Sequence, residues 1–263
     1  MKKISPPRPS AGLPHRRLCL AADVEQYSRL DTRTQSAVQS ELVRLLDEAA
    51  ALTGLDRAAW TRQPQGDLEF AVLPEATPED AVLGLFVHHL AVRLGDRNAR
   101  PASQRMRLRM AVDAGMVAEA ALGHAGPAPV AVARYVNAPQ LKSVLANLTA
   151  ADLAVIVSDR LYQDVVRSGR RDLDPAQYVR AHVRVKEFGG YGWIRVPGHV
   201  PDDVRSAMAE APEPNPSPDA GAPSRTTLSQ YVHQGAAVGR DVFGGLTVGL
   251  PVPPPPTGSG PAR

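Results

Sequence analysis

The sequence predicts an α+β fold built on a mixed sheet. Two observations carry this prediction: short apolar runs of strand length alternate with stretches of helical periodicity, and a hairpin follows the first helix. A hairpin joins antiparallel strands, so the sheet cannot be purely parallel. The predicted order is β-α-β-β-α-β-α-β-α-β-β over about 185 residues.

Capping and turn residues delimit the predicted elements. Asp31 caps the first helix and Gly54 ends it, while Pro139 breaks or kinks the third helical stretch. The glycine-rich segment 189–192 predicts the turn of the last hairpin. In order, the predicted elements are strand 18–22, helix 31–54, strands 58–61 and 68–73, helix 77–92, strand 105–112, helical stretch 130–147, strand 153–157, helix 158–166, and strands 178–185 and 193–196.

Composition excludes several classes of protein. The chain has 263 residues and a formal net charge of +3, an excess that is small and dispersed, so nucleic acid is not an expected partner. Cys19 is the only cysteine, which excludes an intramolecular disulfide and a cysteine-based zinc site and favours the cytoplasm. No apolar run approaches the ~20 residues that span a bilayer, so we expect no membrane partner.

Two acidic residues occupy positions that suit a divalent metal. Asp23 leaves the first strand, and Asp67 follows Gly66 at the tip of the predicted hairpin. Mg²⁺ takes oxygen ligands, usually one or two carboxylates completed by phosphates and water. A strand end beside a hairpin tip brings two such acids together. The alternative is that both are ordinary turn or capping residues.

Three arginines alternate with apolar residues in the predicted strand 105–112. The alternation of Arg105, Arg107 and Arg109 predicts a strand with one wet face. The ordinary interpretation is a solvated face, and the alternative is a face that meets phosphate or RNA.

The segments 20–28 and 65–70 resemble the two metal motifs of class III nucleotidyl cyclases, and the resemblance covers residues 16 to 197. It implies a ferredoxin-like βαββαβ cyclase-type sandwich and a head-to-tail homodimer. By the resemblance, Asp23 and Asp67 are ligands of Mg²⁺ or Mn²⁺, and a nucleoside triphosphate is the ligand. The segment near its phosphates consists of Val24, Glu25, Gln26 and Tyr27.

The other half of the family's site is altered in this sequence. Arg134 falls on the catalytic transition-state arginine, and Lys186 corresponds to a late phosphate-side lysine. Val130 stands where the family has an asparagine, and Pro127 stands where it has a purine-reading residue. Gln63 replaces a purine-contacting lysine. Valine offers no side-chain hydrogen bond and proline lacks even its backbone N–H, so the resemblance implies a degenerate site.

Composition also divides the chain into segments. Prolines concentrate beyond the predicted domain, and a nearly uncharged, β-prone stretch lies between two of their clusters. That stretch resembles bacterial amyloid signalling motifs, which implies co-assembly with a like motif in another protein; the alternative is a hairpin that docks on its own domain. The predicted divisions are a flexible arm (1–15), a cyclase-like domain (16–198), a disordered linker (199–226), the β-prone motif (227–250) and a Pro-rich end (251–263).

Three functions follow from these observations. The first is a degenerate cyclase-like domain that binds nucleotide and metal as a signalling or defence module with a self-association motif. The second is an active, divergent cyclase that converts a nucleoside triphosphate to a cyclic nucleotide and pyrophosphate. The third is an adaptor that binds no nucleotide.

Overall fold

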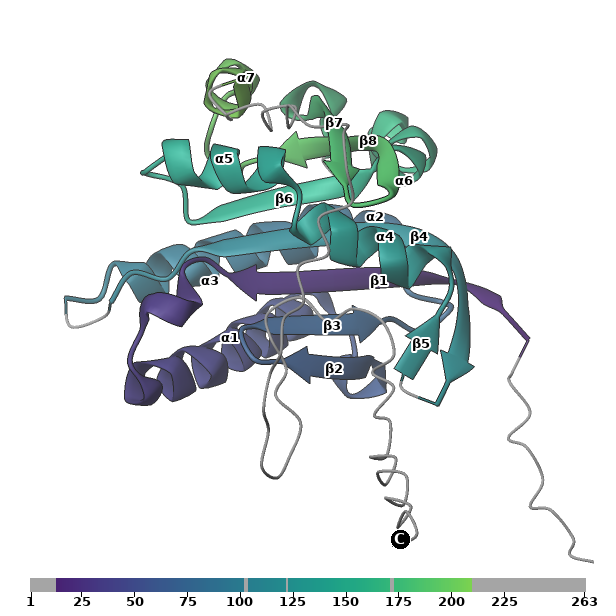
Figure 1. Cartoon of the computed structure of the whole chain (residues 1–263), viewed down its shortest axis with the longest axis horizontal. Coiled ribbons are helices and arrows are strands. Elements are labelled where there is room, and N and C mark those ends of the chain that lie inside the picture. Colours follow the sequence, from purple (N-terminus) through teal and green to yellow (C-terminus); the bar gives the residue numbers. More distant parts are fainter. Residues whose placement is uncertain (1–12, 102–103, 122, 171–172, 210–263) are drawn as a thin grey trace, which may run out of the picture. The chain divides into compact units, whose positions relative to one another are not determined.

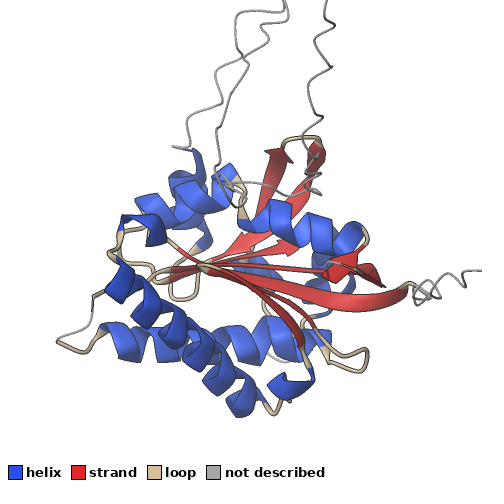
Figure 2. Ribbon diagram, turned by 60° about the horizontal axis from the view of Figure 1, so that its bottom comes forward, coloured by secondary structure: helices blue, strands red, loops and turns tan. Residues whose placement is uncertain are grey.

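The computed structural model describes residues 13–101, 104–121, 123–170 and 173–209, which form a mixed sheet with helices on both faces (Figures 1 and 2). The strand order is β2-β3-β1-β4-β6-β8-β7, with β5 paired to β4; β4 and β6 are parallel, and the other neighbours are antiparallel. This confirms the predicted α+β class. The strands are β1 (His15–Val24), β2 (Thr61–Gln65), β3 (Leu68–Val72), β4 (Leu108–Ala120), β5 (Gly123–Ala125), β6 (Leu153–Ser158), β7 (Val179–Val185) and β8 (Phe188–Arg195).

The helices form one layer on each face of the sheet (Figure 2). Helices α1, α3 and α6 contribute to one core, and α4, α5 and α7 contribute to the other. The α-helices are α1 (Thr32–Thr53), α2 (Glu79–Ala81), α3 (Val87–Asn98), α4 (Pro127–Val136), α5 (Pro139–Asn147), α6 (Asp159–Asp164) and α7 (Pro201–Ala209). The short 3-10 and π turns are η1 (Tyr27–Arg29), η2 (Arg57–Ala59), η3 (Val82–Phe86), η4 (Val166–Ser168) and η6 (Pro175–Gln177).

Strand β1 separates the two cores and thereby sets the orientation of Asp23. Leu20 and Ala22 pack with the α1–α3 core, whereas Cys19 and Ala21 pack with the α4–α5 core. Because side chains alternate along a strand, Asp23 projects toward the α4–α5 face. Strand β1 is also flanked on both sides, by β3 and by β4, so this acid lies in the middle of the sheet.

The predicted boundaries of the first helix are confirmed. The Asp31 carboxylate accepts a hydrogen bond from the Thr34 amide at 3.0 Å, which satisfies one of the free N–H groups at the start of α1. Gly54 ends the helix with a φ of 75°, in the left-handed region that glycine adopts without strain. The predicted hairpin is also present as β2–β3, although its first strand begins at Thr61, because residues 57–59 form η2 instead.

In the second half, one prediction is confirmed and another differs from the structure. Pro139 breaks the predicted helical stretch, as expected, and starts α5 as its first residue. The glycines at 189–192 lie inside β8, and the turn is made by Lys186 and Glu187. Gly192 serves packing, because a Cβ there would lie 2.7 Å from the Ile156 side chain.

The predicted linker begins too early. Residues 201–209 form α7, whose Val204 and Ala207 are buried in the α4–α5 core. One carbonyl near its end bonds to α5, since Ser143 Oγ and Asn147 Nδ2 both donate to the Ala207 carbonyl. The rest of the predicted linker, most of the arm, the β-prone motif and the Pro-rich end lie outside the described residues. No helix among the described residues is long and apolar enough to cross a membrane.

Candidate functional site

Asp23 is a buried carboxylate held by an arginine. Its side chain is 11% exposed, and Arg109 Nη2 on the adjacent strand β4 donates to its Oδ2. Burial raises the pKa of Asp23 to about 6, although the positive charges of Arg109 and Lys142 act to lower it. The charge on Asp67 raises the pKa of Asp23 further. Asp23 therefore lies within electrostatic reach of the second predicted acid.

Asp67 lies in the turn of the β2–β3 hairpin, next to the end of β1. Its backbone carbonyl accepts a hydrogen bond from the Val24 amide at 3.1 Å, which ties the hairpin tip to the residue after Asp23. The structure thus brings together the two acids that the sequence singled out. No group of three or more His, Cys, Asp or Glu side chains in the described part of the chain is arranged to hold a metal ion.

The arginines of the predicted wet face are not solvated as expected. Arg107 and Arg109 have side chains that are 15% and 12% exposed. Arg107 donates to the carbonyls of Leu145 and Leu148 at the end of α5, and to Glu25 at 2.8 Å. Arg105 lies before the strand and is the most exposed of the three. The prediction of one solvated face is wrong because the end of α5, Asp23 in β1 and Glu25 just after it supply partners for Arg107 and Arg109.

The segment predicted to lie near phosphate is a tight turn that is hydrogen-bonded to the hairpin, to the residue just before β4 and to α1. The Glu25 amide donates to the Arg107 carbonyl at 2.9 Å, and the Val24 amide is used by Asp67. Gln26 has a φ of 58° and precedes η1, and the Tyr27 hydroxyl accepts a hydrogen bond from Gln39 at 2.6 Å. Two of the four amides are therefore already occupied, and the role of this segment toward phosphate stays a prediction.

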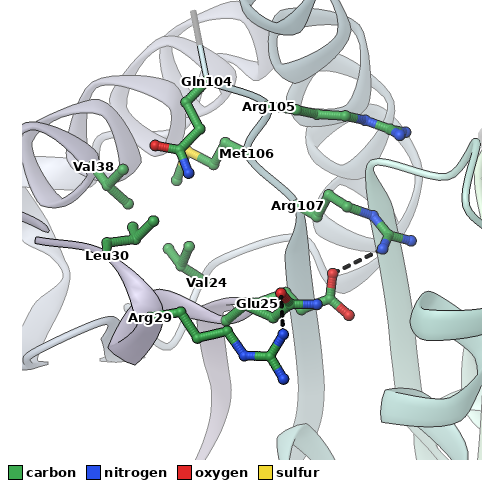
Figure 3. A pocket seen from close by; sticks show the side chains of 10 residues that line it. Val24, Glu25, Arg29, Leu30, Val38, Gln104, Arg105, Met106 and Arg107 are labelled. Atoms are coloured by element: carbon green, nitrogen blue, oxygen red, sulfur yellow. Dashed lines mark hydrogen bonds and ion pairs between the residues drawn. The ribbon is translucent and has the colours of Figure 1, made fainter. Parts of the chain in front are cut away.

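A pocket of about 240 Å³ lies beside this turn (Figure 3). Its apolar wall includes Val24, Val38 and Met106 of the α1–α3 core, whereas neither Asp23 nor Asp67 lines it. In Figure 3, Arg107 points toward Glu25 while Arg105 points away from the pocket. The pocket and the acid pair are therefore separate features.

Arg134 and Lys186 form a second group, distant from the acids. Arg134 Nη2 on α4 donates to Glu187 at 3.0 Å, and Lys186 precedes that acid in the β7–β8 turn. Strand β8 is three strands away from β1 in the sheet. The Arg134 side chain is 11% exposed, and its Nε has no hydrogen-bond partner among the described residues. The structure therefore divides the predicted site residues into an acidic group and a basic group.

The altered positions of α4 have the structure that their residue types predict. Pro127 is the first residue of the helix, and Val130 is 51% exposed on its surface. Neither side chain carries a hydrogen-bonding atom. This helix therefore presents apolar groups at the two positions where the resemblance predicts polar ones.

His124 is a neighbour that sequence reasoning missed. Its Nδ1 lies 3.4 Å from Nε2 of Gln63, and the imidazole ring lies near Phe70 with centroids 6.3 Å apart. Burial lowers the pKa of His124. Strand β5 holds this histidine and was not predicted, because three residues are too few for a periodic pattern. The glycine before it, Gly123, is the available signal, since a Cβ there would collide with Gln63.

The arrangement of the sheet and its helices matches solved cyclase structures. An adenylate/guanylate cyclase/hydrolase from Silicibacter pomeroyi is 21% identical over 70% of this chain and 98% of its own, with a TM-score of 0.51. The chain has the fold of a cyclase catalytic domain. Two further cyclases also align with this chain. The adenylyl cyclase CyaB from P. aeruginosa is 12% identical over 72% of this chain and 98% of its own, with a TM-score of 0.47. The guanylyl cyclase Cya2 is 12% identical over 72% of this chain and 98% of its own, with a TM-score of 0.49.

Sequence comparison alone does not reach these cyclases. No protein-family model matches the sequence, and no curated protein matches it either. The resemblance read from residues 16 to 197 is therefore confirmed for the fold of this cyclase-like domain. The roles predicted for its individual residues stay predictions.

Proposed function

We propose that this cyclase-like domain is a degenerate class III cyclase that binds a nucleoside triphosphate and signals through that binding. One observation carries the proposal: the fold keeps Asp23 and Asp67 together at the end of β1, while the polar groups expected on α4 are missing. An adaptor without a nucleotide site has no reason to hold a second acid beside a buried one, because like charges there are unfavourable.

The positive groups of the domain supply the attraction for a triphosphate. Arg109 and Lys142 act on Asp23 from the α4–α5 face, and Arg134 and Lys186 lie three strands away. Within one chain, the acidic group (Asp23 and Asp67) and the basic group (Arg134 and Lys186) lie apart. A head-to-tail homodimer brings the basic group of one copy to the acidic group of the other, so we include a homodimer in the proposal. The self-association motif at 227–250 adds a route to a partner protein and belongs to the same proposal.

The missing polar groups explain why nucleotide binding would be retained although cyclisation is lost. Removing one hydrogen-bonding group that acts in a transition state typically lowers the rate about 10²–10³-fold. By the resemblance, Val130 and Pro127 stand at two such positions. Cyclisation and base selection would therefore be lost, whereas charge attraction to the phosphates does not depend on either residue.

The test is to incubate the purified full chain with each nucleoside triphosphate and Mg²⁺ or Mn²⁺, and to measure cyclic product by mass spectrometry and unfolding by thermal shift. We expect no cyclic product and a stabilisation of roughly 2.7 kcal/mol at ~100 times the Kd. The Arg134→Ala variant should lose much of this stabilisation, while Arg205→Ala, on exposed α7, should keep it.

Two outcomes would contradict the proposal. Cyclic product that disappears in Asp67→Ala would show an active divergent cyclase. An unchanged unfolding temperature with every nucleotide, with and without metal, would show an adaptor.

A further inference from the structure

Arg109 lies directly opposite Asp23 in the ladder between β1 and β4. The residues on either side are also paired, Ala22 with Met110 and Val24 with Leu108, so backbone register fixes this juxtaposition. Directly opposed side chains in an antiparallel pair have Cβ atoms only about 4.5–5.5 Å apart. The guanidinium therefore reaches Asp23 as a consequence of the sheet and needs no loop to place it.

The pair is also withdrawn from water. The Asp23 and Arg109 side chains are 11% and 12% exposed. An arginine stays charged at any pH that a folded protein tolerates, so it neutralises the carboxylate permanently. Burial protects the pair from screening by salt.

The donor set around Asp23 does not fit a resident divalent cation. Such an ion needs ionised carboxylates and several further oxygen ligands. One carboxylate oxygen of Asp23 already accepts a hydrogen bond from Arg109. Among the described residues, Asp67 is the acid whose charge raises the pKa of Asp23, so few further oxygen ligands are at hand. A metal would have to displace a cation that the strand register holds in place.

We infer that Arg109 is the built-in counter-cation of this site and takes the place of a divalent metal at Asp23. A metal at such a site binds a carboxylate on one side and a phosphate on the other. A guanidinium is suited to the same bridging task, because its planar fork of five N–H donors matches both groups. The inference rests on the proposed function for the nucleotide, but the pairing of Arg109 with Asp23 does not depend on it.

Arg109 also keeps donor capacity that Asp23 does not use. Its Nε is buried and has no acceptor among the described residues. Buried N–H groups in folded proteins almost always have a partner, whether protein, water or ligand. An anion bound beside Arg109 would complete its hydrogen bonding after a small rotation of the guanidinium.

The first experiment measures Mn²⁺ binding to the full chain without nucleotide, by electron paramagnetic resonance. We expect weak binding by the natural protein and at least ten-fold tighter binding by Arg109→Met, because that substitution frees the Asp23 carboxylate. The double variant Arg109→Met/Asp67→Asn should return to the weak binding of the natural protein. Arg105→Met is the matched control, since it removes an exposed arginine–aspartate pair just before the same strand, and its Mn²⁺ affinity should not change.

Arg109→Lys keeps the positive charge, so it tests the inference even if Arg109→Met fails to fold. Circular dichroism checks that each variant is folded, and Arg109→Lys should bind Mn²⁺ as weakly as the natural protein. If the natural protein binds Mn²⁺ as tightly as Arg109→Met, or if Arg109→Lys binds it ten-fold more tightly than the natural protein does, the inference is overturned.

The second experiment separates the inference from the proposed function. Fluorescent methylanthraniloyl derivatives of ATP and GTP are titrated in EDTA and again in Mg²⁺. We expect the Kd of the natural protein for nucleotide to differ by less than about two-fold between EDTA and Mg²⁺. We expect Arg109→Met to bind nucleotide at least ten-fold more weakly than the natural protein in EDTA and to regain affinity in Mg²⁺. Binding by the natural protein that requires metal overturns the inference and leaves the proposed function standing. Absence of binding in every condition overturns the proposed function, and the Mn²⁺ titration then decides the role of Arg109 alone.

Discussion

The acidic and basic groups of the candidate site differ in how their charges are satisfied. Asp23 is paired with Arg109 between adjacent strands, and both side chains are nearly withdrawn from water. Arg134 is equally buried, but its partner Glu187 lies in a turn with 79% of its side chain exposed. The acidic group is thus enclosed within the sheet, whereas the basic group is held by an ion pair at the surface.

This difference indicates which group belongs to the fold and which is available to another molecule. A pair with one fully exposed member is easily exchanged for a different anion, because solvent competes for it. A buried pair resists exchange, since separating it leaves an uncompensated charge. The Asp23–Arg109 contact is therefore a permanent part of the domain, and Arg134 is the cation whose partner can be exchanged for a ligand or a second copy.

The largest expected effect comes from the ion pair that anchors the acidic group's hairpin. Both Nη atoms of Arg57 donate to Glu69, at 2.5 and 2.9 Å, and each side chain is 5% exposed. Glu69 lies two residues after Asp67 and faces the α1–α3 core. We expect Glu69→Ala to lower the free energy of unfolding by about 3–5 kcal/mol in urea denaturation, because it leaves Arg57 buried without its main partner.

Two further variants make this prediction specific. Arg205→Ala removes an exposed pair on α7 and should change the free energy of unfolding by less than about 1 kcal/mol. Arg57→Met/Glu69→Leu removes both charges together and should recover most of the stability. A loss below about 1 kcal/mol in Glu69→Ala would mean that the hairpin is not anchored by this pair.

A second prediction concerns the pH dependence of stability through Asp23. Its pKa is about 6 in the folded protein, against an ordinary value of 3.8, so the folded state binds more protons than the unfolded state between these values. The contribution of Asp23 to stability is therefore fully present below pH 3.8 and is lost as the pH rises through 6. Relative to Asp23→Asn, the natural protein should lose about 2.4 kcal/mol between pH 4 and pH 7.

Urea denaturation of both proteins at several pH values checks this expectation. Ser36→Ala, an exposed and non-titrating substitution on α1, should differ from the natural protein by a constant amount at every pH. Parallel curves for the natural protein and Asp23→Asn would show that burial does not penalise this carboxylate.

Local signals in the sequence predicted the elements well, because their physical causes are local. The Asp31 cap and the Gly54 terminator of α1 each depend on a few neighbouring residues. The convergence of Asp23 and Asp67 was also predictable, since a strand end and a hairpin tip share one edge once the hairpin pairs with the strand. The glycines at 189–192 misled the prediction because they lie within β8, where packing against Ile156, rather than a turn, requires Gly192.

The partners of Asp23 could not be predicted, because they depend on register between distant segments. Arg109 lies 86 residues from Asp23 in the sequence, and a shift of one residue would turn its side chain to the other face. The pairing of Gln63 with His124 across 61 residues has the same cause. An alternation of arginines predicts a face of a strand, but not whether acids lie opposite it.

The smallest predicted effect lies in the basic group, at the turn that carries Lys186. This lysine has a φ of 55°, in the left-handed region that costs residues with a Cβ about 1 kcal/mol. Lys186→Gly should therefore raise the free energy of unfolding by about 0.5–1 kcal/mol in urea denaturation. Lys186→Ala is the matched control: it removes the same amine but keeps the Cβ, so it should not gain this stability. Equal stabilities for the two variants would show that the turn is unstrained. Since both variants lack the amine, nucleotide affinity should fall equally in both. The comparison therefore separates the effect of the Lys186 charge on binding from the effect of the turn's geometry on stability.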